Sequence, residues 1–180
     1  MKQAFDKYFE KLNKVYLETF GTKPLVPYSE DLNKDLIVSE PDEEGYVEWQ
    51  PRLQKEEVDW NRIENEIGFK INAELKNYYS IYSFSMIDGI WNNISLYFDA
   101  INLKKSVEET IKYNFDVGQT MYPNSEIFAI GIAEIDGDDG YTLYYDNKTG
   151  IVFCYENDTK NKMNVSDSIS ELIENMEADI

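Results

Sequence analysis

The first twenty residues carry apolar side chains in a helical rhythm. These side chains recur every three or four residues, which places them on one stripe of a helix: Phe5, Tyr8, Phe9, Leu12, Val15, Tyr16 and Phe20. Gly21 follows, and Pro24 and Pro27 lie beyond it, so the pattern predicts a helix over residues 3–20 that stops there. Residues 22–35 have no period and are expected to form a loop.

The next segment changes to the alternation of a strand. Residues 36–38 are expected to form a short strand, 41–45 an acidic turn, and 46–50 a half-buried strand that ends at Pro51. Alternation places Val47 and Trp49 on one side of this strand. Since both are large and apolar, we expect that side to face the core and the other side, with Tyr46 and Glu48, to face outward.

The centre of the chain returns to a helical period. A helix from residue 58 is predicted to stop at Gly68, and a second helix, capped by Asn72, to run to Tyr82. Two strands are expected over 83–99, joined by a turn at Asp88-Gly89. Ser106 and Glu109 form a capping-box signature for a helix over 106–120.

The last third predicts a run of antiparallel strands. Strands are expected over 127–132, 141–145 and 151–156, with an acidic turn at 136–140, a hairpin loop at 146–150 and a closing helix from near Ser166. No repeat or long linker divides the chain. The pattern therefore predicts one α+β domain over residues 1–180, with a mainly antiparallel sheet flanked by N-terminal, central and C-terminal helices.

Composition excludes several kinds of chemistry. The chain has a net charge of −18, no histidine and one cysteine, Cys154, which lies in an apolar run and is expected to be buried. Imidazole catalysis and histidine metal ligation are therefore absent. The turn at 136–140 fails the spacing of a calcium-binding EF-hand loop, and carboxylate pairs such as Glu56 and Glu57 arise by chance among 35 acids. We expect no catalytic activity, no cofactor and no metal.

The acidic charge gathers in two segments. Residues 28–59 hold eleven acids and three bases, a net of −8, and residues 121–159 hold eight acids and one base, a net of −7. Acids interleaved with aromatic side chains suit a docking surface, because rings supply contact area and acids steer a basic partner. The candidate partner-binding residues are Glu43, Glu44, Tyr46, Glu48, Gln50, Glu56 and Glu57, with Asp136, Asp138 and Asp139 as a second patch. The competing interpretation is that Trp49 is only core and the acids only solvate the surface.

The same charge indicates the kind of partner. A strongly acidic surface attracts basic proteins and repels nucleic acid and anionic membranes. No apolar run follows the first charged residues as in a signal peptide, and no stretch is apolar for the roughly 20 residues of a spanning helix. We expect a basic protein partner, no nucleic acid, no membrane insertion and a cytoplasmic location, peripheral at the inner face of the membrane if the partner lies there.

A collinear series of short motifs resembles one known family. The series comprises Leu12-Asn13-Lys14-Val15-Tyr16, Lys23-Pro24-Leu25, Ser29-Glu30-Asp31-Leu32, Leu36-Ile37-Val38, Val47-Glu48-Trp49-Gln50-Pro51, Trp60 to Gly68 and Leu75 to Tyr79. With the hairpin 127–156 and the closing helix in the expected order, the chain resembles the Syd-like branch of the SUKH superfamily. That group contains the SecY-interacting protein Syd and many bacterial toxin-immunity proteins.

The resemblance implies a non-enzymatic α+β scaffold that grips other proteins through a groove, often an acidic one. It suggests first an immunity protein that neutralises a basic, nuclease-type toxin, since nuclease surfaces are basic where they bind phosphate. The alternative is a Syd-like protein that binds basic cytoplasmic loops of the SecY translocon. A structural or regulatory module without a toxin stays open as a third class.

Overall fold

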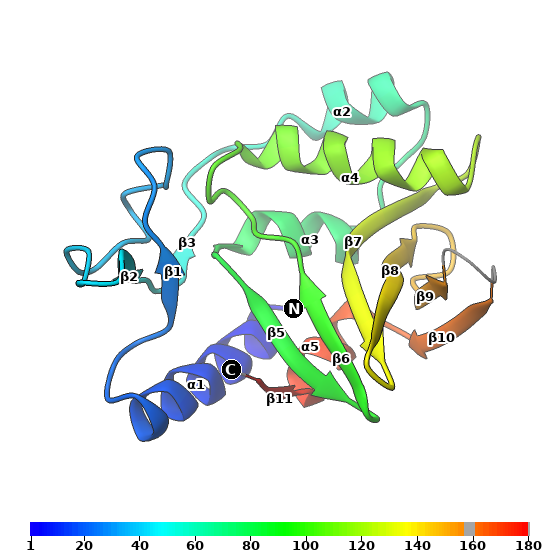
Figure 1. Cartoon of the computed structure of the whole chain (residues 1–180). Helices are drawn as coiled ribbons and strands as arrows, with labels where there is room; N and C mark the ends of the chain where they lie inside the picture. The colour runs from blue at the N-terminus through cyan, green and yellow to red at the C-terminus, as the bar shows by residue number, and fades with distance from the viewer. Residues whose placement is uncertain (157–160, 180) are drawn as a thin grey trace.

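The computed structural model describes residues 1–156 and 161–179, and the side chain of Asp139 lies outside the described part. Five helices occur in these ranges: α1 (Lys2–Thr19), α2 (Trp60–Ile67), α3 (Ala73–Ile81), α4 (Val107–Met121) and α5 (Ile169–Asn175). Figure 1 shows α2 and α4 along the top of the molecule and α1 and α5 along the bottom, with the strands between them. None of the helices in the described ranges is both long and apolar enough to cross a bilayer.

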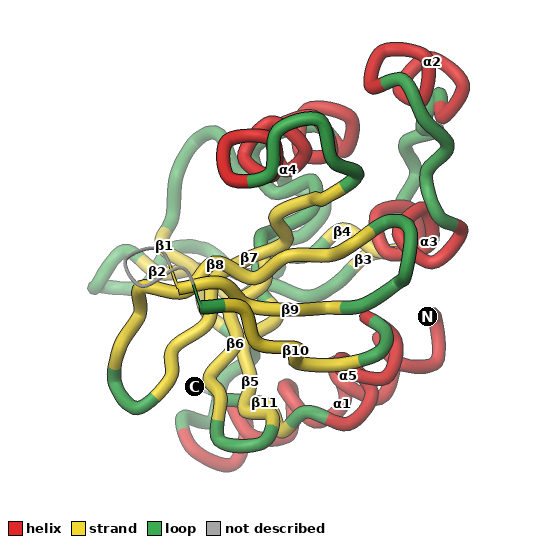
Figure 2. Tube along the Cα trace, turned by 90° about the vertical axis from the view of Figure 1, so that its right-hand side faces the viewer, coloured by secondary structure: helices red, strands yellow, loops and turns green. Residues whose placement is uncertain are grey.

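The main sheet has seven antiparallel strands in the order β10-β9-β8-β7-β6-β5-β11. Neighbouring strands mostly follow one another along the chain, so the sheet is a meander with the C-terminal β11 added at one edge (Figure 2). Its members are β5 (Ile87–Trp91), β6 (Ile94–Phe98), β7 (Ile127–Ile135), β8 (Asp138–Asp146), β9 (Val152–Glu156), β10 (Lys162–Ser166) and β11 (Glu177–Ala178). The predicted α+β class with a mainly antiparallel sheet is confirmed.

Two short strand pairs lie outside the main sheet. Strand β1 (Leu25–Pro27) pairs with β2 (Tyr46–Glu48), and β3 (Arg52–Leu53) pairs with β4 (Tyr82–Ser83). The prediction that 22–35 is all loop is therefore wrong at β1, because pairing with β2 holds a segment that has no period of its own. The strand predicted over 36–38 is reduced to a single bridge from Ile37 to Trp49.

The apolar face of α1 contributes aromatic side chains to the core. Phe5, Tyr8 and Phe9 are buried, and the Tyr8 hydroxyl donates to the Asp88 carbonyl at 2.7 Å and accepts from the Asp88 N–H at 2.9 Å. Phe20 departs from the prediction, since it lies just past the last helical turn and is 56 % exposed. The helix thus ties the main sheet to the first half of the chain.

The turn predicted at Asp88-Gly89 is wrong. Both residues lie inside β5, and the chain reverses at Asn92-Asn93, whose positive φ angles of 50° and 64° suit a tight hairpin. Gly89 is needed for a different reason: a Cβ there would lie 2.4 Å from the carbonyl oxygen of Glu177 in β11. Close approach of the last strand, rather than a turn, accounts for this glycine.

The acidic turn at 136–140 is shorter than predicted. Asp136 and Gly137 form the turn with positive φ angles, and β8 already begins at Asp138. Four further segments were not anticipated as strands: β3, β10 before the closing helix, β11 after it, and β4 at Tyr82, where a helix was expected to continue. The capping box of Ser106 and Glu109 is confirmed at the start of α4, and the closing helix begins after Ser168, whose side chain accepts from the N–H of Glu171.

Cys154 lies in β9 and is fully buried. Burial raises the pKa of its thiol to about 11, so the group is a thiol rather than a thiolate at neutral pH. The predicted role as a small buried apolar side chain is confirmed.

Candidate functional site

The first small strand pair projects from one side of the molecule and carries most of the predicted site. We call residues 25–50, from β1 through β2 to Gln50, the acidic arm; Figure 1 shows its two strands standing apart from the main sheet. Eight acids and one base lie within residues 28–50. The arm is therefore the place to ask whether the acids share a surface.

Two inward side chains root the arm in the core. Val47 and Trp49 are both 0 % exposed, as the alternation of the strand predicted. The Trp49 ring contacts Phe9 of α1 edge-on, with 6.4 Å between ring centroids. The backbone N–H of Trp49 donates to the Pro24 carbonyl at 2.9 Å. Because the buried rings of Trp49 and Phe9 bury apolar area and make an edge-to-face contact, the end of the arm at Trp49 is fixed relative to α1.

The outward face of the arm presents two tyrosines. Tyr46 is 39 % exposed, and Tyr28, which follows β1 directly, is 51 % exposed. The β1–β2 register pairs Pro27 with Tyr46, and the Tyr28 N–H donates to the Gly45 carbonyl at 2.8 Å, so both tyrosines belong to one end of the pair. Tyr28 was missed from the sequence, because its place depends on pairing between segments about twenty positions apart.

A tight turn displays the acids beside these tyrosines. Asp42 Oδ1 accepts from the N–H groups of Glu44 at 2.9 Å and Tyr46 at 2.8 Å, so this carboxylate shapes the turn itself. Glu43 and Glu44 are exposed, and their carboxylates make no hydrogen bond or ion pair within the described ranges. Their charges are therefore available to a partner.

An open groove of about 680 Å³ runs along the arm. Its apolar lining includes Tyr28, Leu32 and Ile37, and Glu30 and Glu40 supply acids at the same groove. Glu48 lies next to it, because its carbonyl accepts from the Val38 N–H at 2.9 Å and its own N–H donates to Ser39 Oγ at 2.8 Å. Apolar lining with acids beside it suits a segment that carries both apolar and basic side chains.

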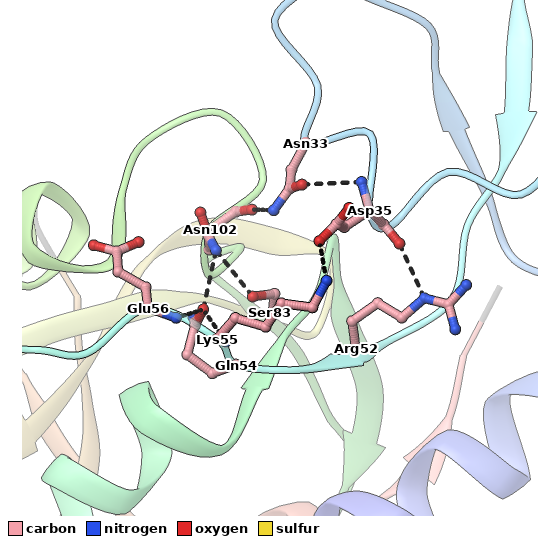
Figure 3. Close-up of polar contacts among 8 residues, drawn as sticks. All are labelled: Asn33, Asp35, Arg52, Gln54, Lys55, Glu56, Ser83 and Asn102. Atoms are coloured by element: carbon pink, nitrogen blue, oxygen red, sulfur yellow. Dashed lines mark hydrogen bonds and ion pairs between the residues drawn. The ribbon is translucent and has the colours of Figure 1, made fainter.

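A polar junction joins the arm to the body of the protein (Figure 3). Asp35 accepts twice: its carboxylate from Lys55 Nζ at 2.7 Å, and its carbonyl from Arg52 Nε at 2.9 Å. The Lys55 ammonium holds the pKa of the Asp35 carboxyl below its usual value. Two of the three bases in the acidic segment 28–59 are thus directed at Asp35, and the third, Lys34, lines the groove. Within the described residues, none of the three makes an ion pair with Glu43, Glu44 or Glu48.

The other side of the junction fixes the loop after β6. Asn33 Nδ2 donates to the Asn102 carbonyl at 2.9 Å, and Asn102 Nδ2 donates to Gln54 Oε1 and Ser83 Oγ, each at 3.1 Å. This bonding links four segments that are distant in sequence (Figure 3). The arm is consequently held at two points, by Trp49 in the core and by Asn33 in the loop between β1 and β2.

The structure separates the remaining predicted residues from this face. Glu56 points away from Asp35 in Figure 3 and lies near the start of α4, where its carboxylate is 3.5 Å from the Val107 N–H. Glu57 beside it is exposed. Gln50 is half-buried and accepts from Lys23 Nζ at 3.2 Å. The arm therefore gathers Glu43, Glu44, Tyr46 and Glu48, with Gln50 at its base, but neither Glu56 nor Glu57.

The second acidic patch is remote from the arm. Asp136 and Asp138 are exposed at the tip of the β7–β8 hairpin, which Figure 1 places on the opposite side of the molecule from β1 and β2. Asp139 belongs to β8, and its side chain lies outside the described part. The two patches are therefore treated as alternative sites.

Comparison with protein families identifies the chain. The model of the Syd protein (SUKH-2) family matches residues 2–96, which is more than half of the 180 residues. The chain belongs to the Syd (SUKH-2) family. The match covers α1, the whole acidic arm, the polar junction up to Ser83, and β5 and β6 as far as Leu96. No curated protein sequence matches the chain.

The extent of the Syd match bears on the two acidic patches. The motifs that resemble the family extend over nearly the whole chain, whereas the match to the family model ends at residue 96, before α4 and the β7–β8 hairpin. The arm thus lies in the part shared with the Syd family, and Asp136 and Asp138 lie outside it. The described residues contain no group of three or more acidic or cysteine side chains placed to hold a metal ion.

Proposed function

We propose that this Syd-family protein binds a basic segment of another protein through the outward face of its acidic arm. The observation that carries the proposal is the exposure of Tyr28 and Tyr46 beside Glu43 and Glu44, acids that have no partner within the described ranges. Exposed rings offer apolar area with little side-chain entropy to lose, and nearby acids accelerate the encounter with a basic surface. The protein acts by binding and carries out no reaction of its own.

The partner proposed first is the set of basic cytoplasmic loops of the SecY translocon. Membership in the Syd family supports this choice over the immunity role that the resemblance suggested first, since the family match favours the SecY-binding alternative. A nuclease-type toxin would use the same docking chemistry, because its phosphate-binding surface is also basic. The two partners are therefore distinguished by binding experiments rather than by the shape of the arm.

The experiment compares two kinds of vesicle. Vesicles that contain SecY and vesicles of the same lipids without it are incubated with the protein, and binding is measured by flotation. We expect binding only to the SecY-containing vesicles, and loss of that binding when Glu43, Glu44 and Glu48 are changed together to Lys. Equal binding to both vesicles, or none to either, would contradict the SecY proposal. In the second case, a toxin gene next to this one would direct the test to that toxin.

A further inference from the structure

A second concave site lies on the body of the protein, under the loop that follows β6. A cavity of about 210 Å³ opens between residues 99–105 and the first half of α4. Most of its wall is apolar and comes from Ala100, Leu103 and the ring of Tyr113. For comparison, an apolar cavity of about 150 Å³ in another protein takes up benzene, so this space suits a molecule of several heavy atoms.

One acidic side chain of the cavity wall lacks a partner. The Asp99 carboxylate is half-buried and makes no hydrogen bond or ion pair with any described residue. Asn114 also lines the cavity and donates from Nδ2 to Tyr79 Oη at 3.0 Å, but its Oδ1 is closed off from solvent, so a ligand cannot reach that atom. The cavity therefore offers one acceptor, the Asp99 carboxylate, to a ligand that brings N–H groups.

The charge of the site is carried mainly by Asp99. Burial raises the pKa of its carboxyl, and Lys105 nearby opposes part of that rise. Lys104 and Lys105 also line the cavity, but both side chains are exposed, so water and salt screen their charges more than that of the half-buried carboxylate. Lys105 Nζ rests 3.9 Å from the centroid of the Tyr113 ring, which shows that this wall already accommodates an ammonium group.

We propose that this cavity binds an alkyl cation, that is, an aliphatic chain ending in an ammonium or guanidinium group. The methylenes would lie against Leu103 and Tyr113, and the cationic end would donate to the carboxylate of Asp99. An anionic ligand is disfavoured because this half-buried carboxylate would repel it. A neutral apolar ligand would leave the carboxylate without a donor.

Two sources can supply this chemistry, a free alkyl amine or a Lys or Arg side chain of the bound partner. The second source is within reach of the arm, because Asn33 N–H donates to the Leu103 carbonyl at 2.7 Å and ties the cavity wall to the groove segment. Only this second source rests on the proposed function. Binding of a free cation does not depend on it.

The test uses n-butylguanidine as the probe and n-butanol as its neutral counterpart, titrated into the whole protein by calorimetry or by NMR shifts of α4. We expect the guanidine to bind and the alcohol to bind far more weakly. In the Asp99→Asn variant, binding should weaken about tenfold or more, as loss of a charged hydrogen-bond acceptor predicts. Asp116→Asn, which changes an exposed acid of α4 that does not line the cavity, is the matched control and should leave binding unchanged.

Tyr113→Ala provides a second variant that keeps the fold, because this side chain is 52 % exposed. It should weaken the guanidine and leave the unfolding midpoint nearly unchanged. Equal affinity for guanidine and alcohol, or unchanged guanidine affinity in Asp99→Asn, would overturn the proposal. Competition between n-butylguanidine and the bound partner would assign the site to a partner side chain, and simultaneous binding would assign it to a free cation. If no basic partner binds at all, the proposed function fails while the result with the probe still stands.

Discussion

The ring of Trp49 packs edge-on against Phe9, with 6.4 Å between ring centroids, and this contact joins the acidic arm to the first helix. Trp49 is fully buried, yet its Nε1 has no hydrogen-bond partner within the described ranges. The side chain thus stabilises the arm through apolar contact alone, in addition to the backbone hydrogen bond of Trp49 to Pro24. It follows that the size of the side chain at this position matters more than its polar group.

Trp49→Ala should lower the free energy of unfolding by about 3–5 kcal/mol, because it leaves a large cavity in a packed core. Trp49→Phe should cost much less, since it keeps an aromatic ring and removes an unpartnered donor. Chemical denaturation measures both. Phe20→Ala is the control, as that ring is mostly exposed. A similar loss in Trp49→Phe and Trp49→Ala would show that the indole N–H has a partner after all.

Asp42→Ala should loosen the turn that displays Glu43 and Glu44. The variant removes two hydrogen bonds from one carboxylate oxygen, to the N–H groups of Glu44 and Tyr46, and should cost about 1–2 kcal/mol locally. Faster hydrogen exchange at the Tyr46 amide would report the loosening. Glu43→Ala is the control, because it changes the net charge by the same one unit but removes no hydrogen bond of the turn. In this variant the exchange rate of the Tyr46 amide should stay at the wild-type value.

The strand alternation in residues 46–50 was sufficient to place Val47 and Trp49 in the core, because each side of a half-buried strand has its own kind of side chain. The alternation could not reveal Tyr28, which reaches the site only through β1–β2 pairing. The turn predicted at Gly89 was wrong for the same reason. This glycine is required because the distant strand β11 packs closely against it, which its neighbours in sequence do not indicate. The local pattern of apolar and polar residues therefore cannot predict contacts between segments that are distant in sequence.

Charge clustering was likewise an incomplete guide to the site. The sequence grouped Glu56 and Glu57 with the arm by proximity along the chain, but Pro51 and β3 carry them toward α4. The ion pair of Lys55 with Asp35, which directs this cation to Asp35, joins residues twenty positions apart. Which acids share a face was therefore decided by the fold rather than by their spacing.

Acid should destabilise the protein partly through Glu64. This carboxylate is 4 % exposed, and ion pairs from Lys70 at 2.6 Å and Lys76 at 2.5 Å, with the Ile71 N–H at 3.0 Å, lower its pKa from 4.5 to about 2. Because the pKa is lower in the folded state, its stabilising effect is complete above 4.5 and is lost as pH falls toward 2. Glu64→Gln should flatten that part of the curve of unfolding free energy against pH. An unchanged slope would contradict the assignment.

Asp88 should have the opposite effect on stability. Burial, together with the nearby Asp179 carboxylate, raises the pKa of Asp88 from 3.8 to about 6. Since the folded state then holds the proton more tightly, the contribution of this group is largest below 3.8 and is lost as pH rises through 6. The free energy of unfolding of Asp88→Asn should therefore rise relative to that of the wild type as pH increases from 3.8 through 6. A difference that does not change with pH would contradict this.

The central claim is that Glu43, Glu44 and Glu48 on the acidic arm steer a basic partner. The most direct test measures the association rate of the partner with the variant in which all three are changed to Lys. The wild-type rate should fall steeply between about 0.01 M salt, where the screening length is about 30 Å, and about 1 M salt, where it is about 3 Å.

The triple variant should associate at least about tenfold more slowly at low salt and show little salt dependence, with dissociation much less affected. The matched control reverses Asp136 and Asp138 to Lys on the remote hairpin and should retain most of the wild-type rate. We expect a flat salt dependence for the arm variant and a steep one for the hairpin variant. The reverse pattern, with the arm variant indistinguishable from wild type, would contradict steering by the arm and move the site to the β7–β8 hairpin.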